Sequence, residues 1–352
     1  MELLILDTNF KAVDIIDIFE SLIWTDRYNT AGDFELYLSM EKSLLEKLKE
    51  DYYLWNADSE HVMILEDINI TSDVEEGNKL YITGRSLESI LERRIVWGQR
   101  ILSGNLQTAI ETLLNENIIS PSIADRKISN FIFVASTDER ITKLTIDTQY
   151  TGDNLYDVIH TLCEKNGIGF KITLSDTNQF VFSLYIGNDR SYEQTENPYV
   201  EFSPSFDNII NSSYIESKKA YKNVTLVAGE GEGSSRKTAT VGSGVGLERR
   251  ELFTDARDIS SDVGNGVVLT ESQYKEQLIQ RGTDNLAENR IIKAFEGEAE
   301  TTTMFVYGED FFIGDIVQVA NEYGHEGRAR ISELVMSQTE EGTSMYPTFQ
   351  TI

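Results

Sequence analysis

Three histidines and one cysteine are the side chains of this sequence best suited to metal binding or nucleophilic chemistry. His61, His160 and His325 lie far apart, and none has a second ligand at the short spacing that metal sites use. Cys163 falls on the apolar face of a predicted helix, where a small buried side chain is expected rather than a nucleophile. We therefore predict structural roles for these four residues, and no catalytic residue, metal or cofactor.

Carboxylates are the most numerous candidates, because 59 of the 352 residues are aspartate or glutamate. Neighbours such as Glu66-Asp67 and Glu309-Asp310 point to opposite faces if they lie on strands, so they do not converge on one bond. A glycosidase needs only two positioned carboxylates, and the sequence leaves that alternative open.

The glycine-rich stretch 229–246 invites comparison with a phosphate-binding loop. Such a loop places Gly-Lys-Ser/Thr between a strand and a helix, and Lys237 is not placed in that way. Glu230 and Glu232 also repel phosphate. We predict a flexible connection between strands.

Two Leu-Glu-Arg-Arg segments contain the densest basic spots, Arg93-Arg94 and Arg249-Arg250. Ion pairing with nearby acids is the favoured interpretation, and a clamp on a neighbouring subunit's carboxylates is the alternative. Tyr52-Tyr53 and Trp55 form the densest aromatic group. We expect them to pack in a core or interface, and a receptor- or sugar-binding surface is the alternative.

These residues must be positioned by a chain whose two ends read as strands and whose middle reads as helices. The helical spacing of apolar residues predicts helices over 41–50, 86–95, 106–118, 153–166 and 270–288. In the fourth helix, Asp153 is the expected N-cap and Gly167 the stop. Period-two or apolar runs predict strands over 3–6, 21–24, 33–38, 62–70, 79–83, 169–174, 179–186, 209–217, 221–228, 301–307, 316–319, 329–336 and 343–349.

Composition excludes several classes of partner. The formal net charge is −28, the opposite sign to the basic footprint of a nucleic-acid or anionic-membrane binder. Residues 1–100 and 251–352 carry most of the excess acid, whereas 201–250 has seven basic and six acidic groups. No apolar run approaches the roughly 20 residues of a membrane-spanning helix. A signal peptide is not expected, and the single cysteine fits assembly in a reducing compartment.

An ordered set of motifs resembles the ReqiPepy6-type, Gp37-like siphovirus tail protein family. The first motifs are Leu22-Ile-Trp24, Arg27-Tyr28 and Gly32-Asp-Phe-Glu-Leu36, followed by Ile82-Thr-Gly-Arg-Ser-Leu87 and Leu91-Glu-Arg-Arg94. The later ones are Lys222-Asn-Val-Thr-Leu-Val-Ala-Gly-Glu230, Gly246-Leu-Glu-Arg-Arg-Glu251, Asp255-Ala-Arg-Asp258 and Tyr307-Gly-Glu-Asp-Phe-Phe-Ile-Gly-Asp-Ile-Val317. Each motif alone is weak, but their order and spacing cover essentially the whole chain.

The resemblance implies a mixed α+β, β-dominated fold with two tube-type β-barrel domains and inserted α+β domains. The first barrel domain is expected over 1–100, and the second over 201–245 and 301–352. Residues 101–200 are expected to form an inserted α+β domain, and 246–300 a helical or irregular insertion packed against it. Gly314 and Asp315 are expected to form a tight turn between late strands, with or without a contact role.

The same resemblance implies a structural baseplate hub or tail-tip protein of a phage tail or tail-like particle, and not an enzyme. A homotrimeric ring would continue the tail tube, contact the distal tail and tape measure proteins, and be assembled in the host cytoplasm. Its acidic lumen would let DNA pass without sticking. The alternatives are a carbohydrate-active or peptidoglycan-cleaving tail enzyme and a receptor-binding tail module.

Overall fold

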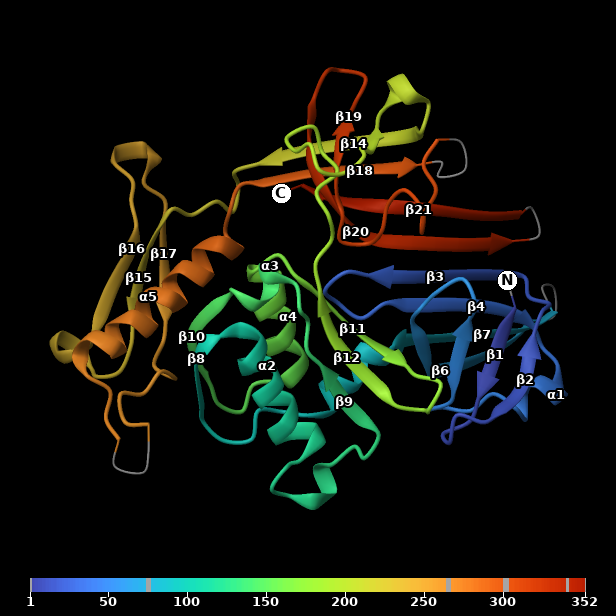
Figure 1. Ribbon diagram of the computed structural model, residues 1–352, viewed down its shortest axis with the longest axis horizontal. Coiled ribbons are helices and arrows are strands. Elements are labelled where there is room, and N and C mark those ends of the chain that lie inside the picture. The colour runs from blue at the N-terminus through green and yellow to red at the C-terminus, as the bar shows by residue number, and fades with distance from the viewer. Residues whose placement is uncertain (1, 74–76, 264–266, 300–303, 340–341, 352) are drawn as a thin grey trace.

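The computed structural model describes residues 2–73, 77–263, 267–299, 304–339 and 342–351, and strands dominate it. Figure 1 shows an N-terminal sheet on one side, a helical unit below the centre, and a second helix-and-strand unit at the opposite end. The late strands β19–β21 lie beside the N-terminal sheet in the same view. The mixed, strand-dominated fold class predicted from the sequence is therefore confirmed.

The largest sheet joins both ends of the chain. Its order is β13-β19-β20-β3-β4-β7-β6-β5-β1-β2, with β21 added to β20. The strands from the first part of the chain are β1 (Leu3–Leu6), β2 (Ala12–Ile16), β3 (Ser21–Arg27), β4 (Asp33–Ser39), β5 (Tyr53–Asn56), β6 (Val62–Asp73) and β7 (Gly77–Ser86). The later ones are β13 (Glu201–Phe202), β19 (Ile316–Ala320), β20 (Glu326–Thr339) and β21 (Gly342–Thr351).

Strand β20 is the link between the two ends. Its first part pairs with β19, its second part pairs with β3, and β21 runs along its other edge. The register between β20 and β21 shifts between Ile331 and Glu333. At the same point on the other edge of β20, pairing with β19 ends and pairing with β3 begins. One long strand therefore makes a continuous backbone connection between the N-terminal and C-terminal parts of the fold.

The N-terminal part follows the predicted alternation closely. In β4, Phe34, Leu36 and Leu38 are buried, and the residues between them are more exposed. The predicted helix 41–50 is wrong, because only α1 (Lys42–Leu45) is helical. The chain turns out of it so that Leu48 is buried beneath the sheet, and Asp51 takes up a φ of +64°. The predicted helix 86–95 is a 3-10 helix, η1 (Leu87–Arg93).

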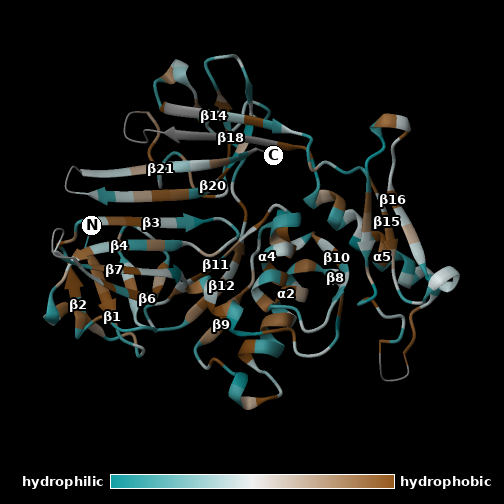
Figure 2. Ribbon diagram, turned by 180° about the vertical axis from the view of Figure 1, so that it is seen from behind, coloured by the Kyte–Doolittle hydropathy of each residue, from teal (hydrophilic) through white to brown (hydrophobic). Residues whose placement is uncertain are grey.

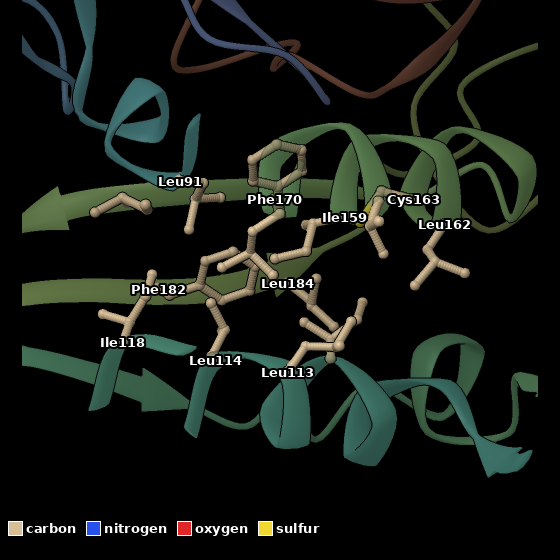
Figure 3. Close-up of a cluster of buried hydrophobic side chains, with 14 of the residues drawn as sticks. Leu91, Leu113, Leu114, Ile118, Ile159, Leu162, Cys163, Phe170, Phe182 and Leu184 are labelled. Carbon is tan, nitrogen blue, oxygen red and sulfur yellow. The ribbon is translucent and has the colours of Figure 1, made fainter. Parts of the chain in front are cut away.

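The central unit packs helices against a small sheet. Its elements are β8 (Arg100–Asn105), α2 (Leu106–Leu114), the π-turn η2 (Asn115–Ile119), η3 (Ala124–Arg126), β9 (Phe131–Val134), α3 (Glu139–Thr142), β10 (Thr145–Tyr150), α4 (Leu155–Lys165), β11 (Gly169–Leu174) and β12 (Phe180–Tyr185). Strand β12 pairs antiparallel with β11 and parallel with β9, while β8 pairs with β10. The hairpin predicted over 169–186 is thus confirmed. Figure 3 shows its aromatic residues interleaved with leucines and isoleucines of α2 and α4.

The helix α4 differs from its predicted start by one residue. Asn154, not Asp153, is the N-cap, and its side chain accepts a hydrogen bond from the Tyr156 amide at 2.9 Å. Asp153 accepts instead from the Thr151 amide at 2.8 Å. The predicted stop is confirmed, because Gly167 has a φ of +64° just past the C-terminus.

The glycine-rich stretch contains a strand that the sequence did not predict. Strand β16 (Thr238–Gly242) pairs with β15 (Val224–Ala228), and β15 pairs in parallel with β17 (Glu251–Asp255). Helix α5 (Glu271–Glu288) covers this three-stranded sheet and lies between it and the central unit (Figure 1). Strand β14 (Ile209–Ser217), which precedes this unit in the sequence, pairs antiparallel with β18 (Ile292–Ala299), which follows it.

The remaining late-strand predictions are mostly confirmed, with one exception. Residues 316–319, 329–336 and 343–349 lie in β19, β20 and β21. The strand predicted over 301–307 is not formed by 304–307, where only Tyr307 makes an isolated bridge, and 301–303 lie outside the described residues. No sheet among the described residues closes on itself, so the two tube-type barrel domains that the resemblance implied are not confirmed.

Candidate functional site: the junction of the three segments

The N-terminal, central and C-terminal segments meet at Tyr28, which directly follows β3. Its amide donates to the Ser332 carbonyl at 2.9 Å, and its hydroxyl donates to the Gly167 carbonyl at 3.0 Å. The hydroxyl of Tyr185 in turn donates to the Tyr28 carbonyl at 3.2 Å. Burial raises the pKa of Tyr28 to about 12, so its hydroxyl remains a protonated donor even above its ordinary pKa of about 10.

Glycines from two other segments make room for the Tyr28 ring. A Cβ at Gly169 would lie 2.5 Å from a ring carbon, and one at Gly314 would lie 2.3 Å from the same carbon. A Cβ at Gly187 would in turn lie 2.0 Å from the Gly314 carbonyl carbon. Contacts under 3 Å are not tolerated by packed carbons, so the junction requires glycine at these positions.

A buried ion pair fixes the C-terminal side of the junction. Arg190 Nε lies 2.7 Å from Asp315 Oδ2, and Asp315 also accepts from the amides of Asn188 at 2.6 Å and Phe312 at 3.1 Å. The expected turn is present, since Gly314 has a φ of +93°. Asp315 additionally has a contact role, because it ties the segment after β12 to the start of β19. Removing one partner of such a pair typically costs about 3–5 kcal/mol.

Two more arginines hold β20 in the junction. Arg330 stacks over the Tyr28 ring at 5.0 Å and donates to the Gly314 carbonyl at 2.7 Å. Arg27 pairs with Glu333 at 2.7 Å across the β3–β20 ladder. Cations therefore reinforce the strand pairing that joins the two ends of the chain.

A buried charged cluster lies where the first sheet meets the central unit. His61 Nδ1 is 3.2 Å from Glu88 Oε1, and Glu88 also accepts from the Ile172 amide at 2.6 Å. Asp26 accepts from Trp24 at 3.0 Å and from Ser59. Burial alone lowers the pKa of His61, but the Glu88 and Asp26 carboxylates outweigh it and raise that pKa to about 9. Burial raises the pKa of Asp26 above its usual range.

The predicted histidines and cysteine are not brought together. His160 contacts the Asn29 carbonyl at 2.9 Å and stacks on Tyr156, whereas His325 stacks on Tyr214 at 4.9 Å. Cys163 is fully buried in the central core, and burial raises the pKa of its thiol well above the usual range. Across the ranges that the structure covers, no three His, Cys, Asp or Glu side chains are grouped to hold a metal ion.

The sequence-predicted acidic pairs are engaged separately. Glu66 binds Arg85 through both oxygens, at 2.8 and 2.9 Å, while Asp67 faces Thr83 on the adjacent strand. Asp310 accepts from the Val306 amide at 2.8 Å, which closes the turn around Glu309.

The glycine-rich stretch has no free cation at Lys237. That lysine lies 2.7 Å from Glu230 and 4.6 Å from the centre of the Tyr274 ring. Burial opposes ionisation of Glu230, but hydrogen bonds from Lys237 and Ser261 lower its pKa to about 2. Lys237 is therefore already paired with a carboxylate, whereas a lysine that binds phosphate needs a free ammonium group.

Of the arginines predicted to form ion pairs, two do so and two do not, and of the aromatic residues predicted to pack in a core or interface, two are packed and one is partly exposed. Arg93 pairs with Asp51 at 2.8 Å, and Arg249 pairs with Glu251 at 2.6 Å, as the ion-pairing interpretation predicts. Arg94 and Arg250 bond only backbone carbonyls within the described structure. Tyr52 and Tyr53 pack against cores, whereas Trp55 is 40% exposed.

The junction residues themselves were missed as a group. The motifs Arg27-Tyr28 and Gly314-Asp315 were noted in the sequence, but nothing local indicates that they meet. What identifies these residues as a group is that added Cβ atoms at Gly169 and Gly314 would overlap the Tyr28 ring. That overlap can be recognised only in the folded structure.

The arrangement of the large sheet, the central helical unit and the junction between them is similar to that of solved tail proteins. A 43 kDa tail protein of prophage MuSo2 from Shewanella oneidensis matches with a TM-score of 0.61 and 13% identity, covering 100% of this chain and 98% of that one. A tail protein from Neisseria meningitidis MC58 matches at 0.57 and 12%, covering 99% and 95%. The prophage tail protein gp18 from Listeria monocytogenes EGD-e matches at 0.55 and 13%, covering 99% and 94%.

Residues 2–349 match the family described as Siphovirus ReqiPepy6 Gp37-like protein, and the chain belongs to that family. This match confirms the resemblance drawn from the ordered motifs. No curated protein matches the sequence. Within the described ranges, no helix is both long and apolar enough to cross a membrane.

Proposed function

We propose that the chain is a structural hub at the distal end of a phage tail, where three copies form a ring that continues the tail tube. The family and the whole-chain tail-protein fold carry this proposal. In it, the two tube-type barrel domains are completed between copies, by the strands of 1–100 and by those of 201–245 and 301–352. Segments 101–200 and 246–300 are the insertions around them.

An apolar sheet edge supports contact between copies. Strand β2 ends the largest sheet, and β1 is its only partner among the described strands. Val13, Ile15 and Ile18 are 39%, 54% and 84% exposed there, and Figure 2 shows β1 and β2 in hydrophobic colours. Exposed apolar edge strands are templates for pairing with another chain. A neighbouring copy would cover this edge in the ring.

The solvent-facing side of the same sheet supports an acidic lumen. Glu35 on β4 lies opposite Thr83 on β7, and Asp67 on β6 lies opposite the same threonine. Two carboxylates therefore flank one threonine in a row across three strands, on the face away from the core. Facing a lumen, they would repel the DNA backbone and let it pass without binding. The other expected partners are the distal tail and tape measure proteins, in a virion tail assembled in the host cytoplasm.

The mass of the assembled hub tests the copy number. Native mass spectrometry of hub complexes released from purified tails should give three copies of the 39.9 kDa chain. A ring with any copy number other than three would contradict the proposal. A zymogram of the purified chain on host cell walls should show no clearing, and lysis would instead favour the enzyme alternative.

The lumen is tested by reversing charge at the proposed lining. Virions carrying Glu35→Lys with Asp67→Lys should assemble but eject DNA several-fold more slowly, because the lysines attract phosphate. A matched control, Glu139→Lys with Glu164→Lys, makes the same charge change on exposed helices of the central unit. Equal ejection rates in both variants would place these acids outside the DNA path.

A further inference from the structure

Two arginines where the N-terminal part meets the central unit lack carboxylate partners, although this chain is rich in acids. Arg94 follows η1, and Arg126 ends η3. Arg94 donates to the carbonyls of Arg126 at 3.0 Å and Arg93 at 2.8 Å. Arg126 donates to the Ile95 carbonyl at 2.7 Å and the Asn117 side chain at 3.1 Å. Neither guanidinium is paired with an acid anywhere in the described residues, although acids outnumber bases by 59 to 31.

The two side chains are held in place reciprocally. Arg94 bonds the backbone of Arg126, and Arg126 bonds the backbone beside Arg94. The loop between them is fixed as well, because buried Val96 donates to the Asp153 carbonyl at 2.9 Å and the Trp97 amide donates to Asn117 at 3.1 Å. The guanidiniums are therefore ordered before any ligand arrives, which lowers the entropic cost of binding.

This arrangement leaves positive charge uncompensated. Burial and the nearby charge of Arg94 both lower the pKa of Arg126. Donors also remain without a protein acceptor in the described structure, namely Nη2 of Arg94 and both Nε and Nη1 of Arg126. An anion placed between the two groups would relieve their repulsion and use these donors.

A groove of about 350 Å³ opens onto this pair, and we call it the Arg94–Trp97 groove. Trp97, Ile95 and Ile123 line it and are 57%, 39% and 40% exposed. Arg126 stacks over the Trp97 ring at 5.0 Å. The groove therefore offers two fixed cations beside an apolar wall.

Two carboxylates at the rim do not neutralise these cations. Glu92 is bound to Arg85 at 2.7 Å, and Asp125 makes no ion pair with either arginine. Their presence selects against an extended polyanion, which would meet them along with the overall charge of −28. One carboxylate next to one apolar group fits the groove better.

We propose that the Arg94–Trp97 groove binds an acidic segment of a partner protein, with a carboxylate between Arg94 and Arg126 and an adjacent apolar side chain against Trp97. The choice of a peptide follows from the charge complementarity and the apolar wall together. Phosphate uses only the charges, and a nucleic acid that stacked a base on Trp97 would bring further phosphates against Glu92, Asp125 and the overall charge of −28. None of the residues that line this groove belongs to β2 or to the Glu35–Asp67 row, and binding there does not depend on ring formation.

Fluorine NMR of the full chain labelled with 5-fluorotryptophan tests the site. The chain has three tryptophans, and the Trp97 resonance is identified by its loss in Trp97→Phe. A blocked synthetic peptide, Gly-Asp-Leu-Glu-Phe-Gly, should shift that resonance saturably and leave the Trp24 resonance unchanged. Its amide analogue, Gly-Asn-Leu-Gln-Phe-Gly, should bind at least tenfold more weakly, because the charged hydrogen bonds are lost.

Variants separate the site from general charge attraction. Arg94→Ala and Arg126→Ala should each weaken binding at least tenfold, whereas the exposed Arg257→Ala should bind as the native chain does. Unchanged chemical shifts of Trp24 and Trp55 verify that each variant is folded. The proposal is overturned if the Trp97 resonance does not respond, responds equally to the amide peptide, or responds more strongly to phosphate or a short oligonucleotide than to the acidic peptide. A negative result would leave the hub proposal standing.

Discussion

Tyr28 owes its place to glycines on two segments that are distant in sequence. Gly169 and Gly314 each approach the ring so closely that a single methyl group would overlap it. The role of this residue is structural, because its backbone, ring and hydroxyl contact all three segments.

Substituting Gly314 tests this dependence. Gly314→Ala should lower the free energy of unfolding by about 3 kcal/mol, because it combines a left-handed backbone with a steric overlap on Tyr28. Gly324→Ala is the matched control, since its φ is +78° but nothing lies within 4 Å of the added Cβ, so about 1 kcal/mol is expected. Urea unfolding followed by tryptophan fluorescence measures both, and equal losses would exclude a packing role for Gly314.

The His61 cluster predicts how stability depends on pH. The pKa of His61 is raised from 6.5 to about 9 in the folded chain, so folding favours its protonated form. The resulting stability is fully present below pH 6.5 and is lost as the pH rises to about 9. We expect a loss on the order of 2 kcal/mol over this interval, seen as a falling urea midpoint.

Replacing the histidine isolates its contribution. His61→Gln should be less stable at pH 6.5 and should lose the part of the pH dependence between 6.5 and 9. His325→Gln, which lies on an exposed turn, should retain the native profile. A native profile in His61→Gln would show that the cluster does not control stability in this range.

At the scale of elements, the contact of α5 with its sheet depends on one small residue. Gly282 lies over β15 and β16, where an added Cβ would be 2.6 Å from Val227 and 2.8 Å from Val241. Gly282→Leu should therefore lift the helix and increase hydrogen exchange in β15–β17 by at least tenfold, with β3 and β4 unchanged. Lys275→Leu, on the exposed side of α5, is the control and should leave exchange unaltered. Exchange that rises uniformly across the chain would indicate global destabilisation instead.

Elements with strong local periodicity were predictable from the sequence. The half-buried strand at 33–38, the helix that stops before Gly167 and the hairpin after it all follow from patterns within about ten residues. Strand β16 was missed because glycines flank its short alternating run, and its partner β15 supplies the stability. The parallel pair β15–β17 and the ladder β14–β18 join distant segments, so no local pattern specifies them.

The candidate site was less predictable than the fold for the same reason. Asp315 looked like a turn residue, and its buried partner Arg190 lies 125 positions away. Arg93 and Arg94 are neighbours with the same side chain, yet only one finds an acid. The difference arises from the reciprocal backbone contacts with Arg126, which the sequence does not reveal.

At the scale of the whole molecule, charge should govern how copies approach one another. Subunits with a net charge of −28 repel at long range, and salt screens that repulsion within about 10 Å at 0.1 M. Association of purified chains should therefore strengthen several-fold between about 20 and 300 mM NaCl, as measured by sedimentation velocity. Association that weakens with salt would show that attractive ion pairs, and not the apolar β2 edge, dominate the contact.

The pairing of β20 with β3 also sets an order of events during synthesis. Arg27 and Glu333 are 306 positions apart, so β3 leaves the ribosome long before its partner exists. At roughly 5–20 residues per second, that interval is about 15–60 s. During this time the edge of β3 that pairs with β20, and the side of the Tyr28 ring that contacts Gly314 and Arg330, have no native cover. The nascent chain is then open to wrong pairings with other nascent chains on the same message. The strand that joins the two ends of the fold thus makes completion of the N-terminal sheet a late event, and chaperone occupancy of the nascent chain should persist until β20 emerges.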